Sequence, residues 1–146
     1  MTRGQPDTKL IRRHLAALRE ALLLLERHVG RTAEQLRSDP ELRWIVERGL
    51  QLCVQNALDV ATHLTTAAGL DAQDYATAVD RLAELSILPP DFAARLRKIA
   101  GFRNVLVHGY LQVDAGILES ALKEGRSELS DFADHIEKHL ERIEKE

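Results

Sequence analysis

The sequence predicts an all-α fold, an up-and-down bundle of four to five main helices with one long central helix. Leucine and alanine dominate the chain, and aromatic residues make up only 4% of it, which favours helices over sheets. Apolar residues recur at spacings of three and four, as on one face of a helix. At 146 residues, the chain is long enough for a single domain, residues 1–146, with a sizeable core.

The first helix is expected to begin at Asp7 or Thr8, either of which can cap it. Residues 1–6 precede it as a loose tail. Gly30 suits the end of the helix, and residues 32–38 form a short helical turn. The apolar side of this helix alternates spacings of four and three, which is typical of a packed seam. Its members are Ile11, Leu15, Leu18, Leu22, Leu25 and Val29.

The second helix is predicted to be the spine of the bundle. Asp39 is a good N-cap, and Pro40 suits the first helical position. The helical pattern then continues to about Ala68, with Gly69 as its stop. About 28 residues at 1.5 Å each give a length of roughly 42 Å. The apolar stripe comprises Val46, Leu50, Cys53, Ala57, Val60, Leu64 and Ala67.

A third helix is expected from an Asp71 cap through Leu85. Two consecutive prolines then break the pattern. A fourth helix is expected to begin near Pro90 or Asp91 and to carry the run from Gly101 onward, with Gly109 as its stop. Its apolar residues are Phe92, Leu96, Ile99, Ala100 and Phe102.

The last helix is expected to begin after an Asp114 cap, following a short extended link at residues 111–113. Gly125 is a point where this helix can bend or break. Residues 141–146 are strongly charged and are expected to fray.

Charge and cysteine content narrow the classes of function. The net charge of −3 argues against a protein that coats nucleic acid nonspecifically, although it permits an RNA enzyme with a local cationic site. Arg95, Arg97, Lys98 and Arg103 do gather in one stretch, either as a solvated helix face or as a patch that guides RNA. The single Cys53 cannot form an internal disulfide; in its apolar setting a buried inert thiol is favoured over a nucleophile.

Two further expectations concern location and metals. No apolar run approaches the ~18 residues of a membrane span, and no stretch reads as a signal peptide, so a cytoplasmic protein without membrane contact is expected. The sequence shows no good metal cluster, and we expect neither a metal nor a cofactor.

The run from Gly101 to Tyr110 carries the strongest chemical signal, because it places Arg103, His108 and Tyr110 in an Arg-x4-His-x-Tyr arrangement. Arginine is a permanent cation whose planar fork grips phosphate. Histidine titrates near neutral pH and can move protons. The pair can therefore act on a phosphodiester without a metal, although both cations are also common at helix C-termini for electrostatic reasons.

On a regular helix, Arg103 and His108 do not point at one common site. Five residues at 100° each point Arg103 and His108 about 140° apart, while Asn104 and His108 share a face. Either the helix ends at 107–109 and swings His108 round, or a second subunit supplies the missing group. Both alternatives favour a site at a helix end beside a cleft.

A second polar set lies on the central helix, where Asn56, Asp59 and His63 follow one stripe. One interpretation is a solvated Asp59–His63 pair. The other is a carboxylate that faces the motif helix and orients Arg103 or a histidine.

The motif and its surroundings resemble the HEPN superfamily, whose ribonuclease signature is Arg-x4-6-His, and in particular its HepT branch. Residues 47–51 through His63, and residues 75–100, also look like this family, so that the resemblance covers roughly residues 8–135. It implies a homodimeric RNA endonuclease toxin in which the 2′-hydroxyl attacks, His108 moves protons, Arg103 stabilises the transition state and Asn104 orients the histidine or the phosphate.

The resemblance also implies a regulatory partner. In HepT–MntA pairs a nucleotidyltransferase antitoxin adds AMP to the tyrosine that Tyr110 matches, and a bulky anionic group beside Arg103 would block substrate. The alternative is a non-catalytic helical module that binds a nucleotidyltransferase or a nucleotide. The intact Arg–His pair favours the enzyme, because a binding module has no need of His108.

Overall fold

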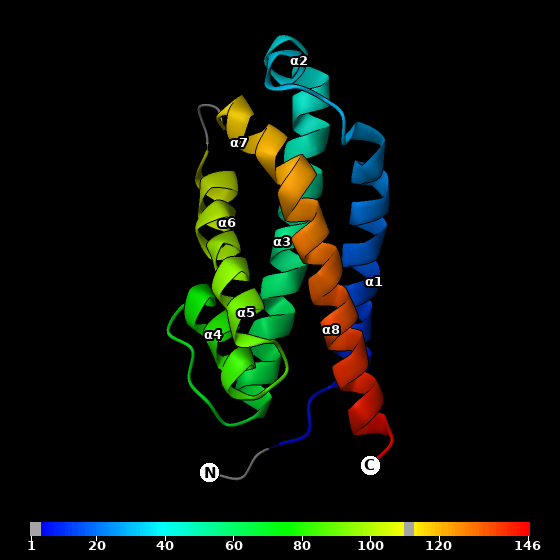
Figure 1. Ribbon diagram of the computed structural model, residues 1–146, viewed down its shortest axis with the longest axis vertical. Coiled ribbons are helices and arrows are strands. Elements are labelled where there is room, and N and C mark those ends of the chain that lie inside the picture. Colours follow the sequence, from blue (N-terminus) through cyan, green and yellow to red (C-terminus); the bar gives the residue numbers. More distant parts are fainter. Residues whose placement is uncertain (1–3, 110–112) are drawn as a thin grey trace.

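Four long helices run alternately up and down in the computed structural model, which describes residues 4–109 and 113–146 (Figure 1). The chain rises through α1, descends through α3, rises again through α6 and descends through α8, so that both ends of the described chain lie at the same end of the bundle. The four helices are α1 (Thr8–Leu25), α3 (Pro40–Ala67), α6 (Lys98–His108) and α8 (Arg126–Glu144). The predicted all-α, up-and-down bundle is confirmed.

Short helices close the two ends of the bundle. The pair α2 and α7 covers one end, where the Glu119 carboxylate accepts a hydrogen bond from the Ala33 backbone N–H at 3.0 Å. The pair α4 and α5 covers the other end, close to the chain termini. These helices are α2 (Ala33–Ser38), α4 (Tyr75–Glu84), α5 (Pro90–Leu96) and α7 (Ala115–Ser120), joined by a 3₁₀ turn at Glu26–His28 and a π-helical turn at Ala121–Gly125.

Helix α3 is the spine that the sequence predicts, because it packs against α1, α2, α4, α6 and α8. The Asp39 side chain accepts from the Leu42 backbone N–H, and Pro40 occupies the first turn. Gly69 follows the helix with a φ of 78°, a left-handed conformation that suits glycine. Of the predicted stripe, Ala67 is only partly buried; the buried members are Val46, Leu50, Cys53, Ala57, Val60 and Leu64.

Helix α1 has the expected cap and a shorter body. The Asp7 side chain accepts from the Leu10 backbone N–H at 3.0 Å. The α-helix ends at Leu25 and a 3₁₀ turn follows, so Gly30 lies beyond the helix rather than at its end. The expected seam is buried through Leu25, whereas Val29 is half-buried.

The connections around α4 differ from the sequence prediction. Asp74, not Asp71, caps α4: its backbone is extended and its side chain accepts from the Thr77 N–H. The backbone oxygen of Asp71 instead accepts from Arg81 at 3.0 Å. Two aspartates three residues apart satisfy the same capping preference, and only the path of the loop selects between them.

The expected fourth helix is two helices, α5 and α6, that meet at Arg97. Its guanidinium holds the Asp80 carboxylate through two nitrogens, at 3.1 and 3.3 Å. This bidentate pair ties the junction to α4, an interaction that local helical periodicity does not encode.

The last expected helix is also divided. Asp114 caps it as predicted, but the π-helical turn ends at Gly125 and separates α7 from α8. Helix α8 continues to Glu144, where the carboxylate pairs with Arg12 at 2.7 Å. The helix therefore extends through most of the segment expected to fray.

Two findings concern the helices outside the motif. Cys53 is fully buried in the core, and burial raises the pKa of its thiol to about 12, so it is the inert thiol that the sequence favours. Within the described ranges, no helix is long and apolar enough to cross a membrane.

A close approach between α1 and α3 yields a stability prediction. A Cβ at Gly49 would lie 2.6 Å from Leu25 Cδ2, whereas one at Gly101 would meet nothing within 4 Å. Gly101→Ala should raise the free energy of unfolding by about 0.5–1 kcal/mol through helix propensity. Gly49→Ala should not raise the free energy of unfolding, because overpacking against Leu25 typically costs about 1–3 kcal/mol and offsets the gain in helix propensity. Denaturant unfolding of the two variants measures the difference; equal gains would contradict the close packing.

Candidate functional site

The motif residues lie in the C-terminal half of α6. Arg103 is half-buried, whereas Asn104 and His108 are exposed. The helix ends at His108, with Gly109 as its C-cap, so the end falls within the predicted range. A cationic histidine at this position is favourable, because the last carbonyl groups of a helix carry partial negative charge.

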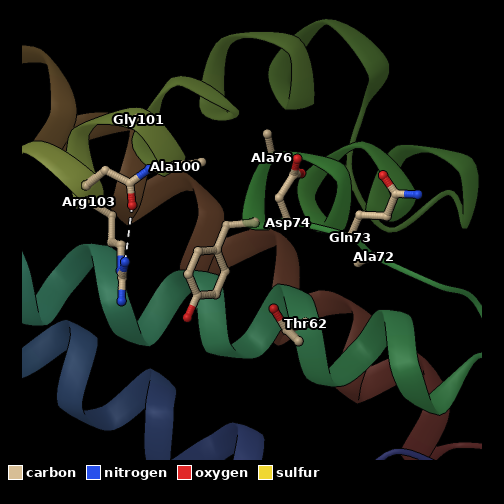
Figure 2. Close-up of a pocket in the computed structure, with 10 residues that line it drawn as sticks. Thr62, Ala72, Gln73, Asp74, Ala76, Ala100, Gly101 and Arg103 are labelled. Atoms are coloured by element: carbon tan, nitrogen blue, oxygen red, sulfur yellow. Dashed lines mark hydrogen bonds between the residues drawn. The ribbon is translucent and has the colours of Figure 1, made fainter.

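Arg103 is held on three sides. Its Nε donates to Gln55 Oε1 at 3.1 Å, and its Nη1 donates to Asn104 Oδ1 at 3.1 Å; the dashed line in Figure 2 marks the second bond. Its Cζ lies 5.2 Å from the centre of the Tyr75 ring, within cation–π range. Among the described residues, Nη2 makes no hydrogen bond, so Arg103 keeps donors for a ligand.

Gln55 joins these contacts into one network. Its Nε2 donates to Asp59 Oδ1 at 2.8 Å and to the Tyr75 hydroxyl at 3.2 Å. Both polar ends of one amide are thus engaged, the carbonyl by Arg103 and the amine by Asp59 and Tyr75. Such a network restricts Arg103 without neutralising it by a direct carboxylate contact.

A cleft of about 540 Å³ opens beside Arg103, between α6 and the start of α4. Figure 2 shows Ala100, Gly101 and Arg103 on one side, Gln73 and Asp74 on the other, and Thr62 on α3 below. The remaining lining residues are Ala72, Tyr75, Ala76 and Asn104. The volume lies within the usual range for small-molecule sites, about 300–1,000 Å³.

His108 lies beyond this cleft, one turn after Asn104 at the C-terminal end of α6. Because α6 stays helical through His108, the two side chains leave the axis about 140° apart and roughly 7.5 Å apart along it. His108 is not among the described residues that line the cleft. The helix end therefore does not swing His108 round to Arg103 within one protomer.

The second polar set does not form one unit. Asp59 lies in the Arg103 network through Gln55. His63 Nε2 instead accepts from the Asp7 backbone N–H at 2.9 Å, and Asn56 Oδ1 lies 2.8 Å from His14 Nδ1. Of the two interpretations, the Asp59–His63 pair is not formed, because each side chain has a different partner, whereas Asp59 does face the motif helix through Gln55. Asn56 and His63 hold α1 against α3.

The basic stretch before the motif behaves mainly as a surface of ion pairs. Arg97 pairs with Asp80, and Arg95 lies 3.8 Å from the Asp91 carboxylate and over the Phe92 ring. Tyr110, the expected acceptor of AMP, lies outside the described residues. In the part of the chain that is described, no three His, Cys, Asp or Glu side chains gather as a metal site would require.

Gln55 and Tyr75 are the site residues that the sequence analysis did not select. Gln55 precedes Asp59 by four residues, so both share one face of α3, and this spacing was the available signal. Tyr75 falls within the predicted third helix and was given no role of its own by the sequence analysis. Its contact with Arg103 joins residues 28 apart, which helical periodicity cannot reveal.

Comparisons with known proteins agree on a family. Residues 18–136 match the model of the family described as ribonuclease HepT-like. A putative RNase of Archaeoglobus fulgidus is 34% identical over 91 residues, which cover 62% of this chain and 69% of that protein. The mRNA nuclease HepT of Shewanella oneidensis is 23% identical over 123 residues, 84% of this chain and 92% of that one.

A solved structure supports the fold. The tri-AMPylated Shewanella oneidensis HEPN toxin, in complex with its MNT antitoxin, superposes with a TM-score of 0.77 at 22% identity. The match covers 88% of this chain and 97% of the toxin. The HEPN-like bundle expected from the motif is confirmed.

The Gln55 network gives a prediction that nuclear magnetic resonance can test. Gln55→Met keeps the length of the side chain but removes its carbonyl and amine, so the Arg103 Nε–H should exchange with solvent several-fold faster. Gln51→Met, one turn earlier on α3, is the matched control and should leave that exchange unchanged. Equal exchange in wild type and Gln55→Met would show that Gln55 does not restrain Arg103.

Proposed function

Because this chain belongs to the HepT-like ribonuclease family, we propose that it is a metal-independent RNA endonuclease and the toxin of a type VII-like toxin–antitoxin pair. The observation that carries this proposal is the restraint on Arg103. A guanidinium fixed by Gln55 and Tyr75, with donors left over, is suited to a phosphate that gains charge during a reaction.

The proposed reaction uses the RNA's own 2′-hydroxyl. The 2′-oxygen attacks the adjacent phosphorus as His108 accepts its proton, and the bond to the 5′-oxygen breaks. That leaving oxygen takes a proton from a second group, so the products are a 2′,3′-cyclic phosphate and a 5′-hydroxyl. Arg103 stabilises the extra negative charge on the phosphorane-like transition state, and Asn104 orients Arg103 through their hydrogen bond.

A homodimer supplies the second proton carrier in this proposal. One histidine cannot serve as base and acid in the same step, but His108 of the partner subunit can take the other part. The angle of about 140° between Arg103 and His108 about the axis of α6 also favours a dimer. A site that uses both side chains needs a second protomer facing the first.

The surface of α3 offers a suitable contact area for this dimer. Trp44, Ile45 and Leu52 are 71%, 55% and 38% exposed, unusual for large apolar side chains in one patch. Leu24 of α1, 50% exposed, lines the same groove as these three residues. Ile45, Leu52 and Gln55 follow at spacings of seven and three, so they share one face of α3, and the apolar patch leads directly to the point where Arg103 docks.

The first test separates catalysis from folding. Arg103→Ala and His108→Ala should each abolish cleavage of RNA while circular dichroism shows an unchanged helical content, because His108 is exposed and the half-buried Arg103 is not part of the apolar core. Gel electrophoresis of RNA after incubation with each variant gives the measurement. A fully active variant would remove the catalytic proposal, and a non-cleaving wild type would favour the alternative binding module.

Mixed dimers extend this test to the subunit arrangement. After co-expression of wild type and His108→Ala in equal amounts, only about a quarter of the dimers carry two intact histidines. Activity should therefore fall to about a quarter, whereas independent sites would retain about half. Activity that follows the wild-type fraction linearly would contradict the paired histidines.

We propose that Tyr110 is the point of regulation. The structurally similar Shewanella toxin is tri-AMPylated and bound to an MNT antitoxin. In this chain, Tyr110 occupies the tyrosine position of the motif. Each AMP adds a phosphate that Arg103 can pair with, so the modified residue would occupy the substrate's place.

Mass spectrometry tests this regulation directly. Incubation with ATP, magnesium and an MntA-like nucleotidyltransferase should add the mass of one or more AMP groups to wild type and none to Tyr110→Phe. Tyr110→Phe should still cleave RNA in the presence of the transferase. An adduct of the same mass on Tyr110→Phe would place the modification at another residue.

A further inference from the structure

We propose that the cleft between α4 and α6 binds one nucleoside of the RNA, next to the phosphate held by Arg103, and thereby selects the cleavage point; this rests on the proposed function. Arg103 and Asn104 line the cleft and also belong to the motif, so a phosphate bound by Arg103 lies at its mouth. The nucleotide attached to that phosphate is the nearest group that can enter.

The lining of the cleft suits a flat ring. Four of the lining residues are alanine or glycine, which leaves a slot between the two helices; they are Ala72, Ala76, Ala100 and Gly101. Tyr75 adds an aromatic side chain, with the Arg103 guanidinium against its ring. Nucleobases stack on aromatic rings and on guanidinium planes, which is the main way that proteins hold single-stranded RNA.

The charges along the cleft give the nucleoside a direction. Arg103 provides a cation at one side, and Asp74 provides a carboxylate at the other (Figure 2). Asp74 Oδ1 accepts from the Thr77 backbone N–H at 2.7 Å, and this hydrogen bond lowers the pKa of the carboxyl, which keeps it an ionised acceptor. A carboxylate repels phosphate but accepts from base amino and imino groups, and it retains further lone pairs for them.

The position of His108 is compatible with this arrangement. The α6 residues of the cleft are Ala100, Gly101, Arg103 and Asn104, and His108 follows at the end of the helix. Asn104 and His108 are four residues apart and share a face of α6, so His108 lies one turn beyond the cleft. A base in the cleft and a phosphate on Arg103 leave the end of the helix, where His108 lies, open to the reacting oxygens.

Gly101 allows the cleft to be filled without loss of the fold. A Cβ at Gly101 meets nothing within 4 Å, and leucine is a better helix former than glycine by roughly 0.8–1 kcal/mol. Gly101→Leu should therefore fold at least as well as wild type while its side chain occupies the slot. Ala94→Leu, an exposed position on α5 outside the cleft, is the matched control.

The probe is a short RNA in which every 2′-hydroxyl except one is methylated, so that only one phosphate can be cleaved. Two further versions carry an abasic residue on one or the other side of that phosphate. Cleavage is measured with active protein, and binding is measured by fluorescence anisotropy with His108→Ala, alone and combined with Gly101→Leu, so that the RNA stays intact.

One abasic version should bind and react roughly ten-fold more weakly with wild type, as expected for the loss of one stacked base. Gly101→Leu should weaken binding and cleavage of the intact RNA by a similar factor. It should cause no further loss with that abasic version, because the contact between the base and the cleft is already missing. Ala94→Leu should behave as wild type. This loss of additivity identifies the base as the group in the cleft.

Other outcomes separate the two proposals. Cleavage by Gly101→Leu equal to that of wild type would overturn the nucleoside site while leaving the nuclease intact, as would equal losses on intact and abasic RNA. Absence of cleavage by wild type, with binding that still responds to Gly101→Leu and to the abasic residue, would reject the nuclease and retain the site. RNA binding insensitive to both changes would reject the site.

Discussion

The hydrogen bond from Arg103 Nε to Gln55 Oε1 is the contact on which the site depends, because it is where α6 is fixed to the spine of the bundle by polar atoms. Gln55 is half-buried there, and a half-buried amide is costly unless its groups are satisfied. Gln55 meets this requirement by bonding Arg103, Asp59 and Tyr75 together.

This arrangement separates two demands on Arg103. The guanidinium must be held in place before substrate arrives, since a fixed cation loses less entropy on binding than a mobile one. It must also remain unneutralised. A direct carboxylate partner would fix the guanidinium but neutralise its charge. An amide carbonyl fixes it and leaves the charge in place. Asp59 contacts Arg103 only through Gln55, so its charge would not directly oppose the phosphate that we propose Arg103 binds.

The sequence predicted the architecture well, because helix caps and apolar spacing are local properties. The Asp39–Pro40 start of α3, the buried stripe of α1 and the Asp114 cap all follow from neighbouring residues. The errors arose where tertiary contacts decide. The division at Arg97 depends on Asp80, and the choice of Asp74 over Asp71 depends on the loop. The candidate site shows the same division: motif spacing selected Arg103 and His108 as candidates, but Gln55 and Tyr75 join Arg103 only through contacts between separate helices.

The angular offset between Arg103 and His108 has a consequence for the time course of activity in a cell. If the proposed dimeric site is the active one, a chain that carries both groups on divergent sides of one helix is inert by itself, and the amount of competent enzyme rises with the square of the chain concentration while dimers are scarce. Synthesis of a few molecules would then be harmless, and damage would begin abruptly once a threshold was passed. On the proposed mechanism, the offset would thus give the cell an interval in which newly made chains can be intercepted before they meet one another.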